Sequence, residues 1–200
     1  MKKNIRSGIL PFLLGIIFLL ISQNVTANEN INWKEAESDD DFVGVWESDI
    51  VLHIPKSEET FMPESSFNIT FTLDYRKPAG FAGNNFKLSI KMDLGKFLTD
   101  WTNEPFIRML GFSKDDLWAL FLGEINSGTG IENITIEKYF ISYSLSERIE
   151  SFANDESIGS IFINDDKTKI KLILGDDIIT LGLGDMGFSE IIMDRKPAAR

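Results

Sequence analysis

Apolar and polar residues alternate with a period of two along much of the chain, as they do in β-strands that bury one face. The alternation is clearest over residues 65–75 and 85–94. Shorter segments of the same kind, bounded by acidic or glycine-rich turns, fill the last third. Together they predict eight strands, at residues 43–54, 65–75, 85–94, 132–145, 157–164, 168–174, 177–183 and 187–195.

The apolar spacing changes to three and four between Gly95 and Glu124, which predicts two or three short helices inside a β-protein. Ser113, with an acid three residues later, is a candidate N-cap, and Gly111 and Gly123 are placed to end helices. The segment carries four large aromatic residues, Trp101, Phe106, Trp118 and Phe121.

In the segment 132–145 the apolar parity slips by one near Glu137 and Lys138, which predicts a bulge within one long strand. The later segments are joined by connections too short to return a parallel strand, so they predict an antiparallel meander of hairpins.

The predicted fold class is therefore mainly all-β. We expect an antiparallel up-and-down barrel of about eight strands, which removes exposed sheet edges, with the helical insert 95–124 between strands three and four. A sandwich of two sheets is the alternative. The barrel is expected over residues 42–196, after a polar lead-in at 28–41 that includes a short helical turn, and before a tail at 197–200.

The first 27 residues combine a basic start with the apolar run Gly8 to Ser22, which is typical of a secretory signal peptide. The small residues before Asn28 predict cleavage after Ala27; an uncleaved anchor is the alternative. We expect an exported protein, periplasmic or secreted. The chain has no cysteine, so we expect neither a disulfide nor a bacterial lipid anchor.

The chain is acidic, with a formal net charge of −11 from 20 basic and 31 acidic residues. This balance argues against nucleic acid and against anionic membrane surfaces, since both need clustered lysine and arginine. No second apolar segment is long enough to span a bilayer.

The first predicted strand opens with "DFVGVWESD", in which Phe42, Gly44 and Trp46 fit the F-x-G-x-W opening of lipocalin-like proteins. Arg195, or Lys196, is available for the basic residue that packs on that tryptophan in this family. The chain resembles a lipocalin-like barrel of the wider calycin group, in a bacterial exported form. We expect one departure from lipocalins, which typically carry a helix after the last strand: no such helix is expected in residues 196–200.

The resemblance implies that Trp46 and Arg195 meet at the closed end of a barrel, and that the insert covers the open end. Gly44 is expected to let another backbone segment pass close. The barrel would bind a small apolar ligand without transforming it. Its expected lining is Leu52, Phe67, Ile69, Ile90 and Met92, with Trp101, Phe106, Trp118 and Phe121 over the mouth. Alternatively, the insert plugs the barrel and these side chains fill its core.

Other chemistry is poorly represented. The stretch 182–187, "GLGDMG", matches a dinucleotide-binding pattern but lacks a following helix, and His53 is the single histidine. The acidic pairs have no EF-hand spacing, so neither a metal nor a cofactor is expected. The sequons at Asn68 and Asn133 matter only in a eukaryotic secretory pathway.

We expect no enzyme. The alternative function is a filled barrel that acts as a protein-interaction module of the cell envelope or host interface.

Overall fold

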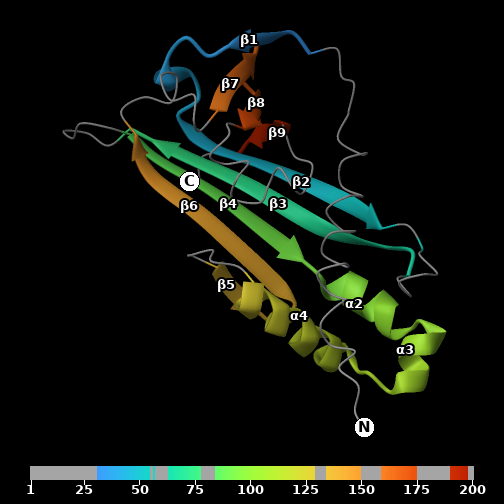
Figure 1. Ribbon diagram of the computed structural model, residues 1–200. Helices are drawn as coiled ribbons and strands as arrows, with labels where there is room; N and C mark the ends of the chain where they lie inside the picture. Colours follow the sequence, from blue (N-terminus) through green and yellow to red (C-terminus); the bar gives the residue numbers. More distant parts are fainter. Residues whose placement is uncertain are drawn as a thin grey trace.

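The computed structural model describes residues 31–54, 56, 63–77, 84–128, 134–149, 159–174 and 190–197. The signal-peptide prediction for residues 1–27 lies outside them, as do Asn133 and the glycine-rich stretch 182–187. Within these ranges the protein is a single antiparallel sheet with a group of helices at one end (Figure 1). The predicted all-β fold class is confirmed.

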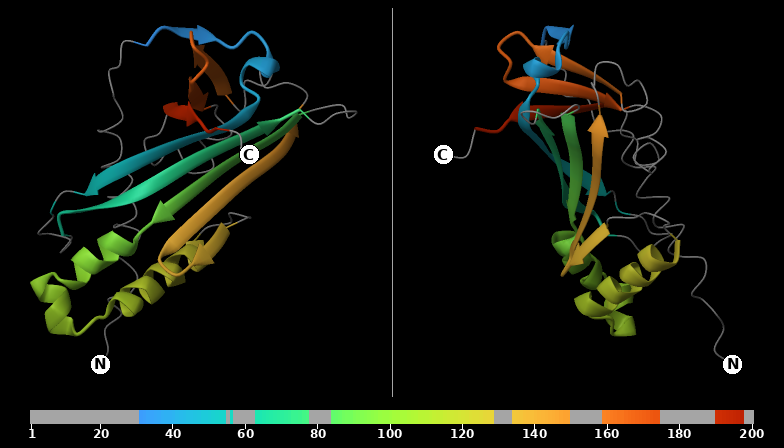
Figure 2. Two further views of the ribbon diagram at one scale, coloured as in Figure 1. Left: turned by 180° about the vertical axis from the view of Figure 1, so that it is seen from behind. Right: turned by 90° about the vertical axis from the view of Figure 1, so that its left-hand side faces the viewer.

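Four long strands form the centre of the sheet as a meander: β2 (Gly44–Ile54), β3 (Ser65–Arg76), β4 (Asn84–Asp93) and β6 (Phe140–Ile149). Short strands extend both sides: β1 (Trp33–Glu35), β5 (Ile134–Glu137), β7 (Gly159–Asn164), β8 (Lys169–Leu174) and β9 (Glu190–Arg195). The strand order is β1-β7-β8-β9-β2-β3-β4-β6-β5. Strands β7 to β9 run across one end of the meander, steeply inclined to it (Figure 2).

All nine described strands belong to one sheet, so the sandwich alternative is wrong for this part of the chain. The described strands leave the sheet open, with β1 and β5 at its two edges, so closure into a barrel stays a prediction. The lead-in contains the expected helical turn, a 3-10 helix at Asp39–Asp41, and also β1, which pairs with β7 and was not predicted.

The prediction of one bulged strand over 132–145 is wrong. The chain turns back at Lys138 and Tyr139, and β5 and β6 form a hairpin in which Ile136 lies opposite Ile141. Tyr139 has a φ of 65°, in the left-handed region that tight turns use. The slip in parity therefore marks a turn between two strands.

The predicted meander over the last strands is also wrong in its pairing. Strand β8 pairs with β7 on one side and directly with β9 on the other, in the register Ile173 opposite Glu190. No strand lies between β8 and β9 along these pairs, and residues 177–183 lie outside the described part of the chain.

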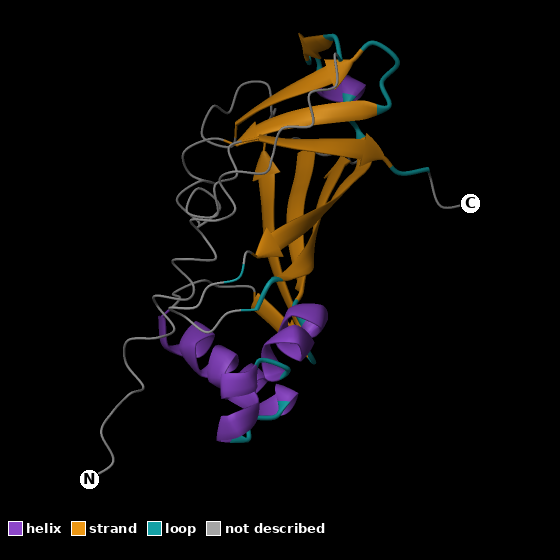
Figure 3. Ribbon diagram, turned by 90° about the vertical axis from the view of Figure 1, so that its right-hand side faces the viewer, coloured by secondary structure: helices purple, strands orange, loops and turns teal. Residues whose placement is uncertain are grey.

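The helical insert is confirmed as α2 (Gly95–Thr102), α3 (Pro105–Leu110) and α4 (Lys114–Gly128). The Ser113 hydroxyl accepts a hydrogen bond from the Asp116 amide at 3.2 Å, while the Asp116 carboxylate accepts from Ser113, as in a capping box. Gly111 ends α3 with a φ of 74°. Gly123 does not end a helix, because α4 continues to Gly128. The three helices lie together at the end of the sheet away from β7 to β9 (Figure 3).

Candidate functional site

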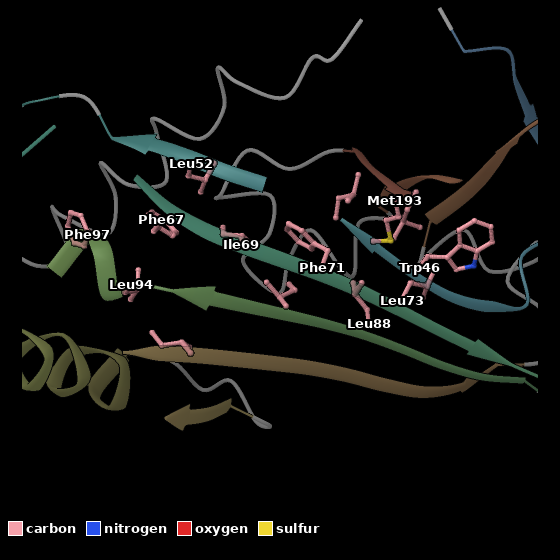
Figure 4. Packing of buried hydrophobic residues seen from close by; sticks show 14 of the residues in the cluster. Trp46, Leu52, Phe67, Ile69, Phe71, Leu73, Leu88, Leu94, Phe97 and Met193 are labelled. Atoms are coloured by element: carbon pink, nitrogen blue, oxygen red, sulfur yellow. The ribbon is translucent and has the colours of Figure 1, made fainter. Parts of the chain in front are cut away.

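The apolar face of the sheet is densely packed where it meets the helices. Leu52 and Phe67 lie opposite each other on β2 and β3 and are 2% and 4% exposed. Phe97 of α2 packs on Phe67 with ring centroids 6.5 Å apart, and Trp101 packs on Phe97 at 5.5 Å. Phe67 on the sheet and Trp101 on α2 are therefore core residues that pack on Phe97, and Leu52 is a core residue beside Phe67; Figure 4 shows Leu52, Phe67 and Phe97.

The other end of the same face is closed by the residues that carry the family resemblance. Trp46 is fully buried, and its Nε1 donates to the Phe42 carbonyl oxygen at 2.7 Å. Arg195 lies opposite Trp46 in the β9–β2 register, with its guanidinium carbon 5.0 Å from the ring centroid. Its Nη2 donates to the Val43 carbonyl oxygen at 2.9 Å. The predicted contact between Arg195 and Trp46 is confirmed.

Gly44 serves a different purpose from the one predicted. Its φ is +144°, which residues with a side chain rarely adopt, while an added Cβ would meet Arg195 nitrogens at an ordinary 3.7 Å. The glycine is thus required by the backbone conformation at the start of β2, and the space beside it is not unusually tight.

Between these two ends lie two consecutive rungs of inward-facing residues. One rung runs Ser48, Phe71, Ile90, Tyr143, and the next runs Ile50, Ile69, Met92, Ile141. Four of the eight residues, Phe71, Ile69, Ile90 and Ile141, are buried. The others keep part of their surface accessible, and we call them the central strip: Ser48, Ile50, Met92 and Tyr143.

The central strip has the chemistry of a site for a largely apolar molecule. Ile69, Phe71 and Ile90 lie between its members and are buried, so the accessible aliphatic surface of the strip comes from Ile50 and Met92. Polar groups are few: the Ser48 hydroxyl has no hydrogen-bond partner among the described residues, and Tyr143 supplies a phenol across the sheet. Ligand sites commonly combine an apolar lining with a small number of such groups.

The remaining aromatic residues of the insert, Trp118, Phe121 and Phe106, lie in different surroundings and do not form a common cover over the central strip. Trp118 stacks on Phe121 at 6.1 Å and meets Tyr139 edge-on at 5.9 Å, so both are buried between α4 and the β5–β6 turn. Phe106 on α3 is 37% exposed. The four aromatic residues predicted over the mouth thus divide into three packing residues and one at the surface.

Two acidic groups of the insert are held by hydrogen bonds from other parts of the fold. The Tyr139 hydroxyl donates to the Asp115 carboxylate at 2.5 Å, and this hydrogen bond raises the pKa of Tyr139 and lowers that of Asp115. A hydrogen bond from Lys96 lowers the pKa of Asp100, and a hydrogen bond from Ser65 lowers it further. These groups join elements of the fold: Asp115 joins α4 to the β5–β6 turn, and Asp100 joins α2 to β3.

Candidate residues for other chemistry lie apart from the strip. His53 is exposed near the end of β2, on the opposite face of the sheet. Within the described ranges, no three histidine, cysteine, aspartate or glutamate side chains gather as metal ligands would. Among the helices that the structure describes, none has both the length and the apolar character needed to span a bilayer.

Sequence reasoning identified Leu52, Ile69, Ile90 and Met92 as inward residues, and all four face the apolar side. It missed Ser48, Ile50 and Tyr143. The first two share the parity of Trp46 and Leu52 within β2, so the alternation itself held the signal.

The described fold defines a class: an all-antiparallel β-protein whose single open sheet carries a tryptophan–arginine pair at one end and helices at the other. Comparisons with protein-family models, with curated proteins and with solved structures gave no match. The lipocalin-like relationship therefore stays a prediction.

Proposed function

We propose that this is an exported, lipocalin-like binding protein that holds a small apolar ligand at the central strip without transforming it. One observation carries the proposal. Ile50 and Met92 face the apolar side of the sheet yet keep accessible surface, although the residues at both ends of that face are buried. Accessible apolar surface inside a packed face is what an apolar ligand would cover.

The strip also suggests the kind of ligand. A hydrocarbon body would lie on the accessible surface of Ile50 and Met92, and a single polar group would accept or donate a hydrogen bond at Ser48. Burying roughly 300 Å² of apolar surface contributes about 7 kcal/mol before the cost of immobilising the ligand. Closure of the sheet into a barrel is part of this proposal, supported by the curvature of the sheet in Figure 3 and by the Trp46–Arg195 contact.

The proposal is tested by a variant in which a bulky side chain blocks the central strip. Ser48→Trp places an indole on the apolar face, while the control Asp49→Trp places the same group on the next residue of β2, which faces the opposite side and is exposed. We expect the unmodified protein to bind a fluorescent fatty-acid probe. Ser48→Trp should weaken that binding at least tenfold and Asp49→Trp less than twofold, with both variants folded by circular dichroism.

Two results would refute the proposal. One is an unmodified protein that neither takes up the probe nor releases any small molecule into organic solvent. The other is equal loss of binding in the two variants. A protein without any ligand would favour the alternative, a filled barrel that acts as a protein-interaction module.

A further inference from the structure

Exposed large apolar residues are concentrated on the helical insert. Of the six found among the described residues, five lie between residues 106 and 120, and the sixth is Val51 on β2. Four of the five are close in sequence, and we call them the apolar tip: Phe106, Met109, Leu110 and Phe112. Their exposed fractions are 37%, 74%, 51% and 38%.

The apolar tip is built on an ordered element. Phe106, Met109 and Leu110 have the i, i+3, i+4 spacing that places residues on one face of a helix. Pro105 begins α3, Gly111 ends it, and Ile107 is buried against the rest of the insert. A helix held in this way presents its apolar face as a fixed feature, and such exposed patches usually mark an interaction surface.

The position of the tip favours a surface over a small molecule. Helix α3 lies at the extremity of the molecule, beyond α2 and α4 and far from β1 and β7 (Figures 1 and 2). Side chains that project from an outer helix cannot enclose a ligand, because ligand sites are concave. They can enter a soft apolar medium that closes around them.

The charges around the tip fit a lipid surface. Residues 105–113 contain no acid, although the chain has 31, and their one charged residue is Arg108, which is exposed and has no ion pair among the described residues. Of the nearby acids, Asp100 and Asp115 form ion pairs with Lys96 and Lys138. Glu104, the N-cap residue of α3, has no ion pair among the described residues and lies one helical turn before Arg108. The tip itself therefore carries one exposed cation that can meet a phosphate, and Glu104 is the adjacent acid at its edge.

We infer that the apolar tip inserts into the surface of a lipid bilayer, with Arg108 at the level of the headgroup phosphates. Because a single cation is available in an acidic chain, apolar insertion and not charge drives the contact, so zwitterionic lipid suffices. This inference does not depend on a ligand at the central strip, and the two proposals are tested separately.

The experiment uses the chain from Asn28 to Arg200, which is the expected mature protein, and vesicles of phosphatidylcholine. Because the chain has no cysteine, Met109→Cys carries a unique fluorescent label at the tip, and Val51→Cys carries the same label at an exposed site on β2. Nitroxide-bearing lipids should quench the label at residue 109 and leave the label at residue 51 unchanged.

A charge variant measures the contribution of the tip. Met109→Glu should lower the vesicle-bound fraction in co-sedimentation at least tenfold, whereas Val51→Glu, the same change in charge at an exposed apolar site elsewhere, should lower it less than twofold. Both positions are at least half exposed, so both variants should fold.

Three results would overturn the inference. They are an absence of binding to vesicles, equal effects of the two glutamate variants, and binding that requires anionic lipid and ignores residue 109. Self-association that Met109→Glu abolishes, without any vesicle binding, would assign the tip to a second copy of the chain and would likewise reject the lipid surface.

Discussion

The contact between Arg195 and Trp46 gives the most specific prediction about stability. Arg195→Met keeps much of the aliphatic stem but removes the guanidinium that lies 5.0 Å from the Trp46 ring and donates to the Val43 carbonyl oxygen. A cation–π contact at an exposed site contributes about 0.5–1 kcal/mol, and one hydrogen bond adds about 1 kcal/mol. We therefore expect a loss of about 2 kcal/mol.

For a domain of this size, that loss corresponds to a fall of roughly 4–8 °C in Tm. Thermal unfolding followed by circular dichroism measures it. Lys196→Met is the matched control, because Lys196 is the adjacent basic residue but forms an exposed ion pair with Glu47 and does not stack on the tryptophan. Its effect should be much smaller.

Arg195→Lys separates the charge from the planar group. A lysine keeps the positive charge but cannot offer the same flat, forked guanidinium to the ring and the carbonyl, so an intermediate loss is expected. The reasoning is refuted if Arg195→Met and Lys196→Met lower Tm equally, or if Arg195→Met lowers it by less than about 1 °C.

Two further predictions concern the insert. Gly111→Ala should lower the free energy of unfolding in urea by about 1 kcal/mol, because the φ of +74° disfavours a side chain; no clash contributes, since nothing lies within 4 Å of the new Cβ. Gly111→Asn should lower it less, because asparagine tolerates the left-handed region better. Equal losses in the two variants would contradict this reasoning. Hydrogen bonds from Lys96 and Ser65 lower the pKa of Asp100 in the folded state, so its contribution is complete above the ordinary value of 3.8 and is lost as pH falls through the lower folded value. The stability difference between the unmodified protein and Asp100→Asn should therefore shrink between pH 6 and pH 3, and a constant difference would contradict the assignment.

Much of the sheet was predictable because one face is buried along whole strands. In β3 every second residue from Phe67 to Tyr75 is buried, and a period-two pattern of that length has no helical interpretation. The hairpin of β5 and β6 was not predictable in the same way. Its turn residues, Lys138 and Tyr139, are not the glycine, asparagine or aspartate that usually identify a tight turn.

The candidate site was predictable only in part. Alternation shows that Ile69 and Met92 point to the same face, but the exposure of each depends on what packs over it, and that is a property of the tertiary structure. The exposure of the residues in the apolar tip was not predictable from the sequence for the same reason. Ile107 and Met109 are both apolar residues of α3, yet the first is buried and the second is the most exposed large apolar residue described.

The pairing of β9 with β2 has a consequence for how the protein folds. Strands β2, β3 and β4 pair with their neighbours in sequence, and β4 pairs with β6 across the helical insert and β5. The β9–β2 pairing is registered at only two positions and brings together residues 152 apart, Arg195 and Val43. Such distant pairings form slowly. While the chain folds, the edge of β2 that β9 covers would stay open to pairing with other chains until β9 arrives. The contacts of Arg195 with Trp46 and with the Val43 carbonyl oxygen would then hold β9 on β2 and complete the sheet.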